Sequence, residues 1–251
     1  MALLRTVKLK KYFGDTHAVD GVDFTVQKGE FLSLVGSNGA GKTTLVNLIS
    51  AFLRPDDGKI FFKDKDITFA SVDERLRAGI ARSFQLVNLF DDLTAFDNVA
   101  LSIFSREQKT LRLMRLADRD ADVRREADDL LRQFGLEAKR HVAVRGLAQG
   151  ERKLLDVAVA YALRPKLLFL DEPTSGVSTR DKTQIMDIIS SVVRAGNVTA
   201  VIIEHDMDVV FRYSDRVVVM HQGTILADGT PDEIQRDPAV AANLLGVQAV
   251  S

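Results

Sequence analysis

The stretch FLSLVGSNGAGKTT, residues 31–44, decides the fold that we expect for this chain. Its first five residues form an apolar run of strand length, and a glycine-rich segment follows at once. Beyond that segment an apolar set recurs at helical spacing until Pro55 ends the pattern: Leu45, Leu48, Ile49 and Phe52. A strand, a glycine loop and a helix in this order predict one strand–helix unit of a parallel sheet.

The segment GSNGAGKT, residues 36–43, matches the pattern G-x-x-x-x-G-K-[ST] in full. Glycines let the backbone wrap closely around a phosphate chain, and successive N–H groups then point into one hollow at a helix N-terminus. Lys42 is placed to neutralise β- and γ-phosphate charge, and the Thr43 hydroxyl to ligate Mg²⁺. The pattern therefore predicts a site for ATP and Mg²⁺ built from Gly36, Ser37, Asn38, Gly39, Ala40, Gly41, Lys42, Thr43 and Thr44.

A second segment, LLFLDE at residues 167–172, predicts a buried strand that delivers two carboxylates at its C-terminal end. Asp171 would hold Mg²⁺, directly or through water, and Glu172 would orient and deprotonate an attacking water. The plainer interpretation is a pair of solvated acids that opens a turn before Pro173. The phosphate loop earlier in the chain favours the catalytic interpretation.

Composition excludes several classes of protein. The chain has 251 residues, 46% of them hydrophobic, and a net charge of −1, which argues against a dedicated nucleic-acid binder. It has no cysteine, so disulfides and Cys-ligated zinc are excluded, and its four histidines show no metal-ligand spacing. The N-terminus lacks the pattern of a signal peptide, and no run of 18 apolar residues occurs. We therefore expect the chain to reach a membrane only through a partner.

The remaining pattern predicts an α/β fold. Val22, Phe24 and Val26 alternate with polar residues as in a strand, and residues 198–203 and 216–220 resemble central parallel strands, with a hairpin strand in 222–229. Residues 88–164 show helical signals only, including an apolar stripe in a charged helix: Val123, Ala127, Leu130, Leu131 and Phe134. A helix between two of the later strands is expected to bury a second stripe: Ile185, Ile188, Ile189, Val192 and Val193. We expect a RecA-like core in 1–87 and 165–235, with an antiparallel β region, an inserted helical subdomain in 88–164, and a tail in 236–251.

The motifs together resemble those of ABC-transporter nucleotide-binding subunits. The phosphate loop, ARSFQ, LAQGE, LLFLDEPTSG and VIIEHD occur in the order and at the spacing of that family, over essentially the whole chain. Two segments are most similar to the ATP-binding subunits of branched-chain amino-acid importers: ARSFQLVNLF and, near the end of the chain, ADGTPDEIQRDPAVAANLLG. The ATPase of lipopolysaccharide export is a further near relative.

The resemblance implies roles for several residues to which the local sequence pattern assigns none. It implies that Phe13 stacks on adenine, with Tyr12 as the alternative, and that Gln85 contacts Mg²⁺ and the attacking water. It also implies that His205 contacts the γ-phosphate. The segment LAQGE matches the signature motif, which in this family reaches ATP held by the other subunit of a dimer: Leu147, Ala148, Gln149, Gly150 and Glu151.

Two positions depart from the family pattern. Ala148 replaces the usual serine of the signature, which removes a charge-assisted hydrogen bond worth roughly 1.5–3 kcal/mol. Ser178 replaces the usual aspartate of the loop that bridges the two subunits. Both departures affect residues that the resemblance places at the interface with the other subunit. The residues expected to bind this chain's own ATP match the family pattern.

The resemblance implies an ATPase whose two copies, or two homologous subunits, close around two Mg·ATP and drive integral-membrane permease subunits. A periplasmic binding protein would belong to an importer of this kind, and the chain would be cytoplasmic and peripheral on the plasma membrane. Four alternatives stay open at this point: an ATPase of lipid export, a soluble ABC ATPase without a transport role, a phosphate-loop kinase of a small molecule, and a regulatory subunit that binds ATP without turnover.

Overall fold

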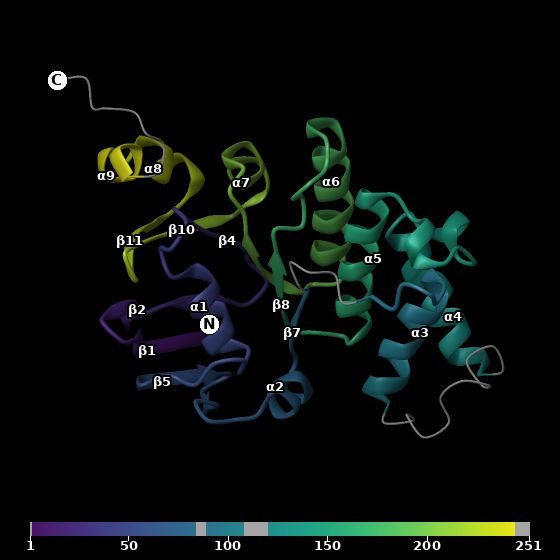
Figure 1. The fold of residues 1–251 in the computed structure, drawn as a ribbon, viewed down its shortest axis with the longest axis horizontal. Helices are drawn as coiled ribbons and strands as arrows, with labels where there is room; N and C mark the ends of the chain where they lie inside the picture. Colours follow the sequence, from purple (N-terminus) through teal and green to yellow (C-terminus); the bar gives the residue numbers. More distant parts are fainter. Residues whose placement is uncertain (1, 84–88, 108–119, 244–251) are drawn as a thin grey trace. The chain divides into compact units, whose positions relative to one another are not determined.

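The computed structural model describes residues 2–83, 89–107 and 120–243 (Figure 1). The chain divides into two compact units, which are described separately. Unit 1 comprises residues 1–78 and 199–251, and unit 2 comprises residues 79–198.

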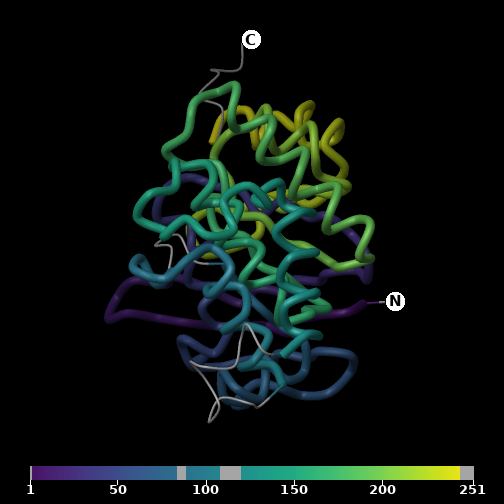
Figure 2. Tube along the Cα trace, turned by 90° about the vertical axis from the view of Figure 1, so that its right-hand side faces the viewer, coloured from purple at the N-terminus to yellow at the C-terminus, as the bar shows by residue number. Residues whose placement is uncertain are grey.

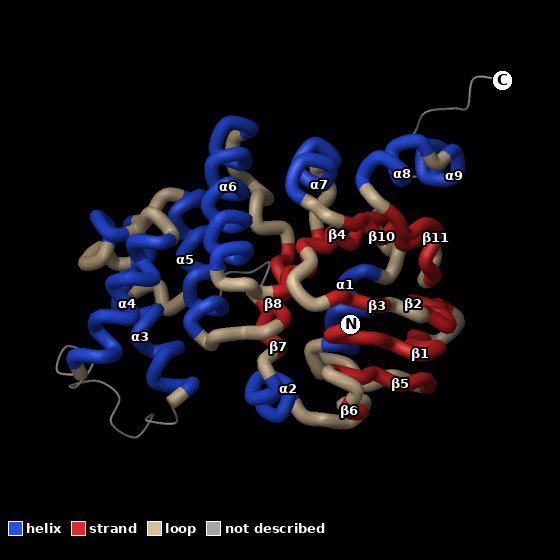
Figure 3. Tube along the Cα trace, turned by 180° about the vertical axis from the view of Figure 1, so that it is seen from behind, coloured by secondary structure: helices blue, strands red, loops and turns tan. Residues whose placement is uncertain are grey.

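The N-terminal part of unit 1 is an antiparallel sheet built around one long strand, β1, as Figure 3 shows. The strand β1 pairs with β2, β3 and β5, and β5 pairs with β6. Val22, Phe24 and Val26 are buried and the residues between them are not, so the predicted alternation is confirmed. The bounds are β1 (Ala2–Phe13), β2 (Thr16–Val22), β3 (Thr25–Gln27), β5 (Asp57–Phe62) and β6 (Lys65–Asp66).

The second sheet of unit 1 carries the predicted parallel strands. β4 (Phe31–Gly36) lies between β9 (Thr199–Ile203) and β10 (Arg216–His221) and is parallel to both. β11 (Thr224–Gly229) returns antiparallel to β10, which confirms the predicted hairpin. All six residues of β4 are buried, as expected of a central parallel strand.

The helices of unit 1 follow these strands. α1 (Lys42–Ile49) follows β4 and the glycine loop, α7 (Met207–Tyr213) follows β9, and α8 (Pro231–Arg236) and α9 (Pro238–Asn243) follow β11. The last two lie side by side near the end of the described chain (Figures 1 and 2). They contribute Ile234 and Val240 to an apolar cluster with Val217 and Val219 of β10, so this segment is part of the folded unit.

Arg75 of α2 (Val72–Ala78) is a buried cation that joins three segments of unit 1. Its Nη1 donates to the carbonyl oxygens of Leu48 and Ile49, each at 2.6 Å, at the C-terminal end of α1. Its Nη2 donates to those of Ile67 (2.8 Å) and Thr68 (2.9 Å). Burial lowers the pKa of the guanidinium to about 10, so it stays charged at neutral pH. A cation at this end of α1 also complements the helix dipole.

We expect the Arg75→Met substitution to lower the free energy of unfolding by about 3 kcal/mol or more, because each hydrogen bond to a charged group contributes ~1.5–3 kcal/mol. Urea denaturation followed by circular dichroism measures this change. Arg77→Met, at an exposed position of the same helix, is the matched control and should shift stability by less than about 0.5 kcal/mol. Equal stability of the two variants would contradict the joining role of Arg75.

Unit 2 combines a short parallel strand pair with a set of helices. β7 (Ile80–Arg82) runs parallel to β8 (Leu167–Asp171), whose residues are all buried. The predicted apolar stripe of α4 is buried throughout, which confirms that prediction. In α6 Met186 is buried and Ile188 is only half-buried, so the predicted stripe was wrong at Ile188. The helices are α3 (Ala95–Arg106), α4 (Ala121–Gln133), α5 (Gln149–Ala162) and α6 (Thr179–Ala195), with 3-10 turns at Glu137–Lys139 and Val144–Gly146.

Candidate functional site

The glycine loop of unit 1 connects the buried end of β4 to the first turn of α1. Gly41 has a φ of 103°, and a Cβ there would lie 2.2 Å from the carbonyl oxygen of Ala18. At Gly36 a Cβ would lie 2.3 Å from the carbonyl oxygen of Met220. Side chains are therefore excluded at both positions, because the loop backbone runs directly against neighbouring strands.

The other residues of the loop and of the first turn of α1 differ in their exposure to solvent. Ser37, Asn38, Gly39 and Thr43 are exposed, whereas Ala40 is buried and Thr44 is half-buried. The exposed part is the part that a phosphate chain could reach. It lies at the N-terminus of α1, where the first backbone N–H groups have no intrahelical acceptor and the dipole favours an anion.

Lys42 is the buried cation of this loop, with 6% of its surface exposed. Its Nζ donates to the carbonyl oxygens of Gly36 (2.7 Å) and Ser37 (3.0 Å). The ammonium is thus held against the loop backbone, close to the predicted position of the phosphates. The arrangement provides a fixed positive charge beside a set of backbone donors, which is the chemistry that binds a polyphosphate.

Phe13 and Tyr12 stand at the end of β1 in different environments. Phe13 is 50% exposed, and the Lys11 Nζ lies 5.5 Å from the centroid of its ring. The Tyr12 hydroxyl donates to Asp20 at 2.6 Å, and its ring stacks on His17 with centroids 4.2 Å apart. The hydrogen bond to Asp20 raises the pKa of Tyr12 to about 12. Phe13 therefore has the face that is more accessible to a planar ligand.

His205 of unit 1 follows β9 by two residues and is exposed. The next residue, Asp206, is the N-cap of α7 and accepts hydrogen bonds from the backbone N–H groups of Asp208 and Val209. This cap fixes the turn on which His205 stands. Gln85, which the resemblance implies contacts Mg²⁺ and the attacking water, lies outside the described residues.

In unit 2, Asp171 at the C-terminal end of β8 is 5% exposed and forms an ion pair with Arg82 of β7. The Arg82 Nη2 lies 2.5 Å from the Asp171 Oδ2, and the Arg82 side chain is also nearly buried. Sequence reasoning missed Arg82, although it lies in the ARSFQ motif. A cation bound to the Asp171 carboxylate would compete with this guanidinium.

Glu172 follows Asp171 directly and begins a tight turn. Its φ is 47°, in the left-handed region that non-glycine residues rarely adopt, and its carbonyl oxygen accepts from the N–H of Ser175 at 3.1 Å. Its side chain is half-buried. Strained backbone of this kind is common at functional sites, because the surrounding structure must hold it in place.

The predicted signature segment forms the start of α5, the helix that begins at Gln149. Ala148 is its N-cap residue, and the Ala148 N–H donates to the Glu151 carboxylate at 2.9 Å. Alanine has no side-chain acceptor, so only this half of a capping box exists. The Glu151 carboxylate also pairs with Lys139 at 3.1 Å. A Cβ on Gly150 would lie 3.2 Å from Ile185 of α6, which shows how closely the two helices pack there.

Ser178 has a structural role that sequence reasoning missed. It is the N-cap of α6, its hydroxyl donates to the Asp181 carboxylate at 2.7 Å, and its Oγ accepts from the Asp181 N–H at 3.3 Å. The pattern S-x-x-D at the start of a helix is the signal that points to this cap.

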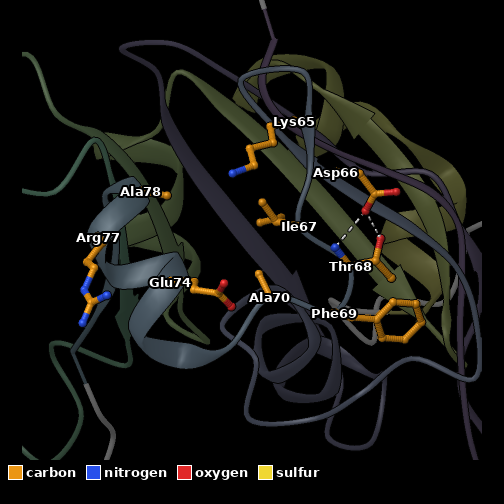
Figure 4. A pocket seen from close by; sticks show the side chains of 9 residues that line it. All are labelled: Lys65, Asp66, Ile67, Thr68, Phe69, Ala70, Glu74, Arg77 and Ala78. Atoms are coloured by element: carbon orange, nitrogen blue, oxygen red, sulfur yellow. Dashed lines mark hydrogen bonds between the residues drawn. The ribbon is translucent and has the colours of Figure 1, made fainter.

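A separate cavity of about 650 Å³ lies in unit 1 between the β5–β6 hairpin and α2 (Figure 4). Asp66 accepts hydrogen bonds there from the N–H and hydroxyl of Thr68, at 2.9 and 2.6 Å. The cavity contains no residue of the predicted ATP site. Its lining residues are Lys65, Asp66, Ile67, Thr68, Phe69, Ala70, Glu74, Arg77 and Ala78.

Each predicted Mg²⁺ ligand, taken by itself, carries an oxygen donor that suits a hard divalent cation. The predicted ligands described here are the exposed hydroxyl of Thr43 in unit 1 and the carboxylate of Asp171 in unit 2. Both supply oxygen, the ligand type that Mg²⁺ prefers, and Mg²⁺ completes its coordination with waters and phosphate oxygens.

Across the described ranges, no helix is both long enough and apolar enough to cross a membrane.

A strand, glycine loop and α1 helix with a buried lysine, and a buried strand that ends at Asp171 and is followed by Glu172, define a nucleotide-binding protein of the phosphate-loop class. Residues 19–175 match the ABC transporter family, and residues 224–243 match the branched-chain amino acid ATP-binding cassette transporter family. The chain belongs to the ABC transporter family.

The similarity to known proteins extends over nearly the full length of the chain. The chain is 33% identical to the high-affinity branched-chain amino acid transport ATP-binding protein LivG of Escherichia coli, over 97% of this chain and 98% of the relative. It is 34% identical, with the same coverage, to the corresponding protein BraF of Pseudomonas aeruginosa. The crystal structure of the ADP conformation of MJ1267, an ATP-binding cassette of an ABC transporter, aligns with a TM-score of 0.87 and 31% identity, covering 98% of this chain and 100% of that one. The family and the fold class predicted from the sequence are confirmed.

Proposed function

We propose that this chain is the ATP-hydrolysing subunit of an importer and energises membrane permease subunits that take up branched-chain or other hydrophobic amino acids. The observation that carries the proposal is the full-length similarity to LivG and BraF, two branched-chain amino acid transport ATP-binding proteins. The intact phosphate loop, with its buried Lys42 and exposed Thr43, supports hydrolysis as the reaction.

In the proposed reaction, the loop backbone and Lys42 bind the phosphates of ATP. Thr43, Asp171 and Gln85 would hold Mg²⁺, which neutralises charge on the β- and γ-phosphates. Glu172 accepts the proton of the attacking water, and His205 donates a hydrogen bond to the γ-phosphate. The proton moves from water to the Glu172 carboxylate, and the products are ADP and phosphate.

The segment from Ala148 to Glu151 would contact the nucleotide of a paired subunit, which is a second copy or a homologous chain. The N-terminus of α5 suits this role, because the first N–H groups of a helix have no intrahelical acceptor and the helix dipole attracts phosphate. ATP binding would close the pair, and hydrolysis would reopen it. The permease subunits would hold the chain at the inner face of the plasma membrane, and a periplasmic binding protein would deliver the amino acid.

Two measurements test the proposal. The purified chain should release phosphate from ATP in the presence of Mg²⁺ and without any added acceptor, whereas a small-molecule kinase needs an acceptor. Deletion of its gene should abolish uptake of labelled leucine, and the wild-type gene should restore uptake while the Glu172→Gln gene should not. Normal leucine uptake in the deletion strain would contradict the proposed import role.

We expect Phe13→Ala to weaken ATP binding by about 5- to 150-fold, because stacking of a base on an aromatic ring contributes ~1–3 kcal/mol. Tyr12→Phe, which keeps the ring and removes the hydroxyl, is the matched control and should leave the ATP affinity within about twofold. Titration with a fluorescent ATP analogue measures both affinities. If Tyr12→Ala weakens binding and Phe13→Ala does not, the assignment of the stacking residue is wrong.

A further inference from the structure

Lys153 of α5 is a buried cation outside the predicted motifs of unit 2. Only 4% of its surface is exposed, and its Nζ donates to the carbonyl oxygen of Glu172 at 3.1 Å and to the Ser175 hydroxyl oxygen at 2.9 Å. An ammonium removed from water is costly unless acceptors replace the lost hydration. These two acceptors are therefore part of what makes the buried position of Lys153 stable.

Both acceptors belong to the turn that carries the Glu172 carboxylate. The Glu172 carbonyl oxygen also accepts from the Ser175 N–H at 3.1 Å, so Lys153 contacts the two ends of one closed turn. The left-handed backbone of Glu172, with φ of 47°, costs of order 1–3 kcal/mol and persists only when its surroundings fix it. The hydrogen bonds from Lys153 are contacts of the kind that can fix it.

We propose that Lys153 is a positioning residue for hydrolysis: its ammonium holds the Glu172–Ser175 turn in the conformation from which the Glu172 carboxylate acts on water. The inference rests on the proposed function, in which Glu172 is the general base. A general base must lie within hydrogen-bond reach of the water that it deprotonates, and a displacement of about 1 Å can cost 10²-fold in rate.

Lys153 lies close to the predicted signature segment along α5. Gln149, the first residue of α5, lies one helical turn before Lys153. A single helix thus carries both the predicted signature segment and the hydrogen bonds to the turn of Glu172.

The test compares Lys153→Met, which keeps most of the volume and removes the charge and donors, with Lys153→Arg, which keeps a charge and N–H donors. We expect Lys153→Met to lower kcat by about 10- to 100-fold and to leave KM and ATP affinity within about twofold. Lys153→Arg should recover most of kcat. Lys166→Met, at an exposed lysine just before β8, is the matched control with unchanged kcat.

Thermal melting and the fraction of ATP-binding sites separate positioning from stability. A purely structural Lys153 predicts lower melting temperatures for Lys153→Met but a wild-type kcat per folded site, and that result overturns the inference. If Lys153→Met does not fold, the Ser175→Ala variant tests the positioning role, because it keeps the Lys153 ammonium and removes one of its two acceptors. We expect Ser175→Ala to lower kcat by about 2- to 10-fold, and an unchanged kcat in that variant overturns the inference.

ATP turnover by the wild-type protein separates failure of the proposed function from failure of the positioning role of Lys153. If wild-type chain shows no ATP turnover, the proposed function fails, and the inference fails with it. If wild-type chain turns ATP over and Lys153→Met does so equally well per folded site, only the positioning role is wrong.

Discussion

Replacement of Glu172 by Gln is expected to lower ATP turnover by about 10²–10⁴-fold, because the amide cannot accept the proton of the attacking water. Glutamine is close to glutamate in size and can keep the turn that joins Glu172 to Ser175. ATP affinity should therefore stay within about threefold of wild type, since the substitution leaves the phosphate loop unchanged. Phosphate release and ATP titration under the same conditions measure the two quantities.

The matched control is Glu137→Gln, which removes an exposed carboxylate of the same unit. Its turnover should equal that of wild type, because the Glu137 carboxylate lies 3.5 Å from Arg132 in a surface ion pair of small energy. Retention of more than about a tenth of wild-type turnover in Glu172→Gln would mean that another group accepts the proton.

Replacement of Lys42 by Ala is expected to weaken ATP binding by at least about a hundredfold, because several charge-assisted hydrogen bonds to phosphate disappear together. Turnover should fall below detection as a result. The Nζ of Lys42 also donates to the carbonyl oxygens of Gly36 and Ser37, so the loop loses two internal contacts as well. Isothermal titration with ATP, alongside a thermal melt, separates the binding loss from any loss of folding.

Lys28→Ala provides the matched control for Lys42. Lys28 is exposed in the turn before β4 and lies in the same unit. Its removal should change the ATP affinity by less than about twofold, since exposed charges away from the ligand are largely screened. Equal affinities of Lys42→Ala and wild type would contradict the assignment of the phosphate loop.

The fold was predictable from the sequence where a local pattern is unambiguous. The run 31–35 followed by the glycine loop predicts β4, the loop and α1, and each is present. The helical stripe of α4 and the β10–β11 hairpin were equally clear, because period and turn residues agree there. The wrong position in the α6 stripe, Ile188 in place of Met186, arises because several apolar residues in one helix permit more than one buried face.

The partners of three buried or nearly buried cations were not predictable from the sequence. Arg75, Arg82 and Lys153 are each buried charges whose partners come from other elements, and sequence spacing contains no information on such partners. The signal available for Lys153 is its place in α5, where it shares a helix face with the buried Val157 and Ala160. A lysine on a buried helix face needs acceptors, and that need could have directed attention to it.

The most direct test of the proposed mechanism is the sedimentation velocity of Glu172→Gln protein with and without Mg·ATP. We expect a second copy of the chain to take the place of a homologous subunit in the purified protein, and slow hydrolysis by the variant to keep the closed pair populated. The expected result is a monomer without nucleotide or with ADP, and a dimer at saturating ATP. A monomer at ATP concentrations that fill the binding site would contradict closure of two subunits around ATP.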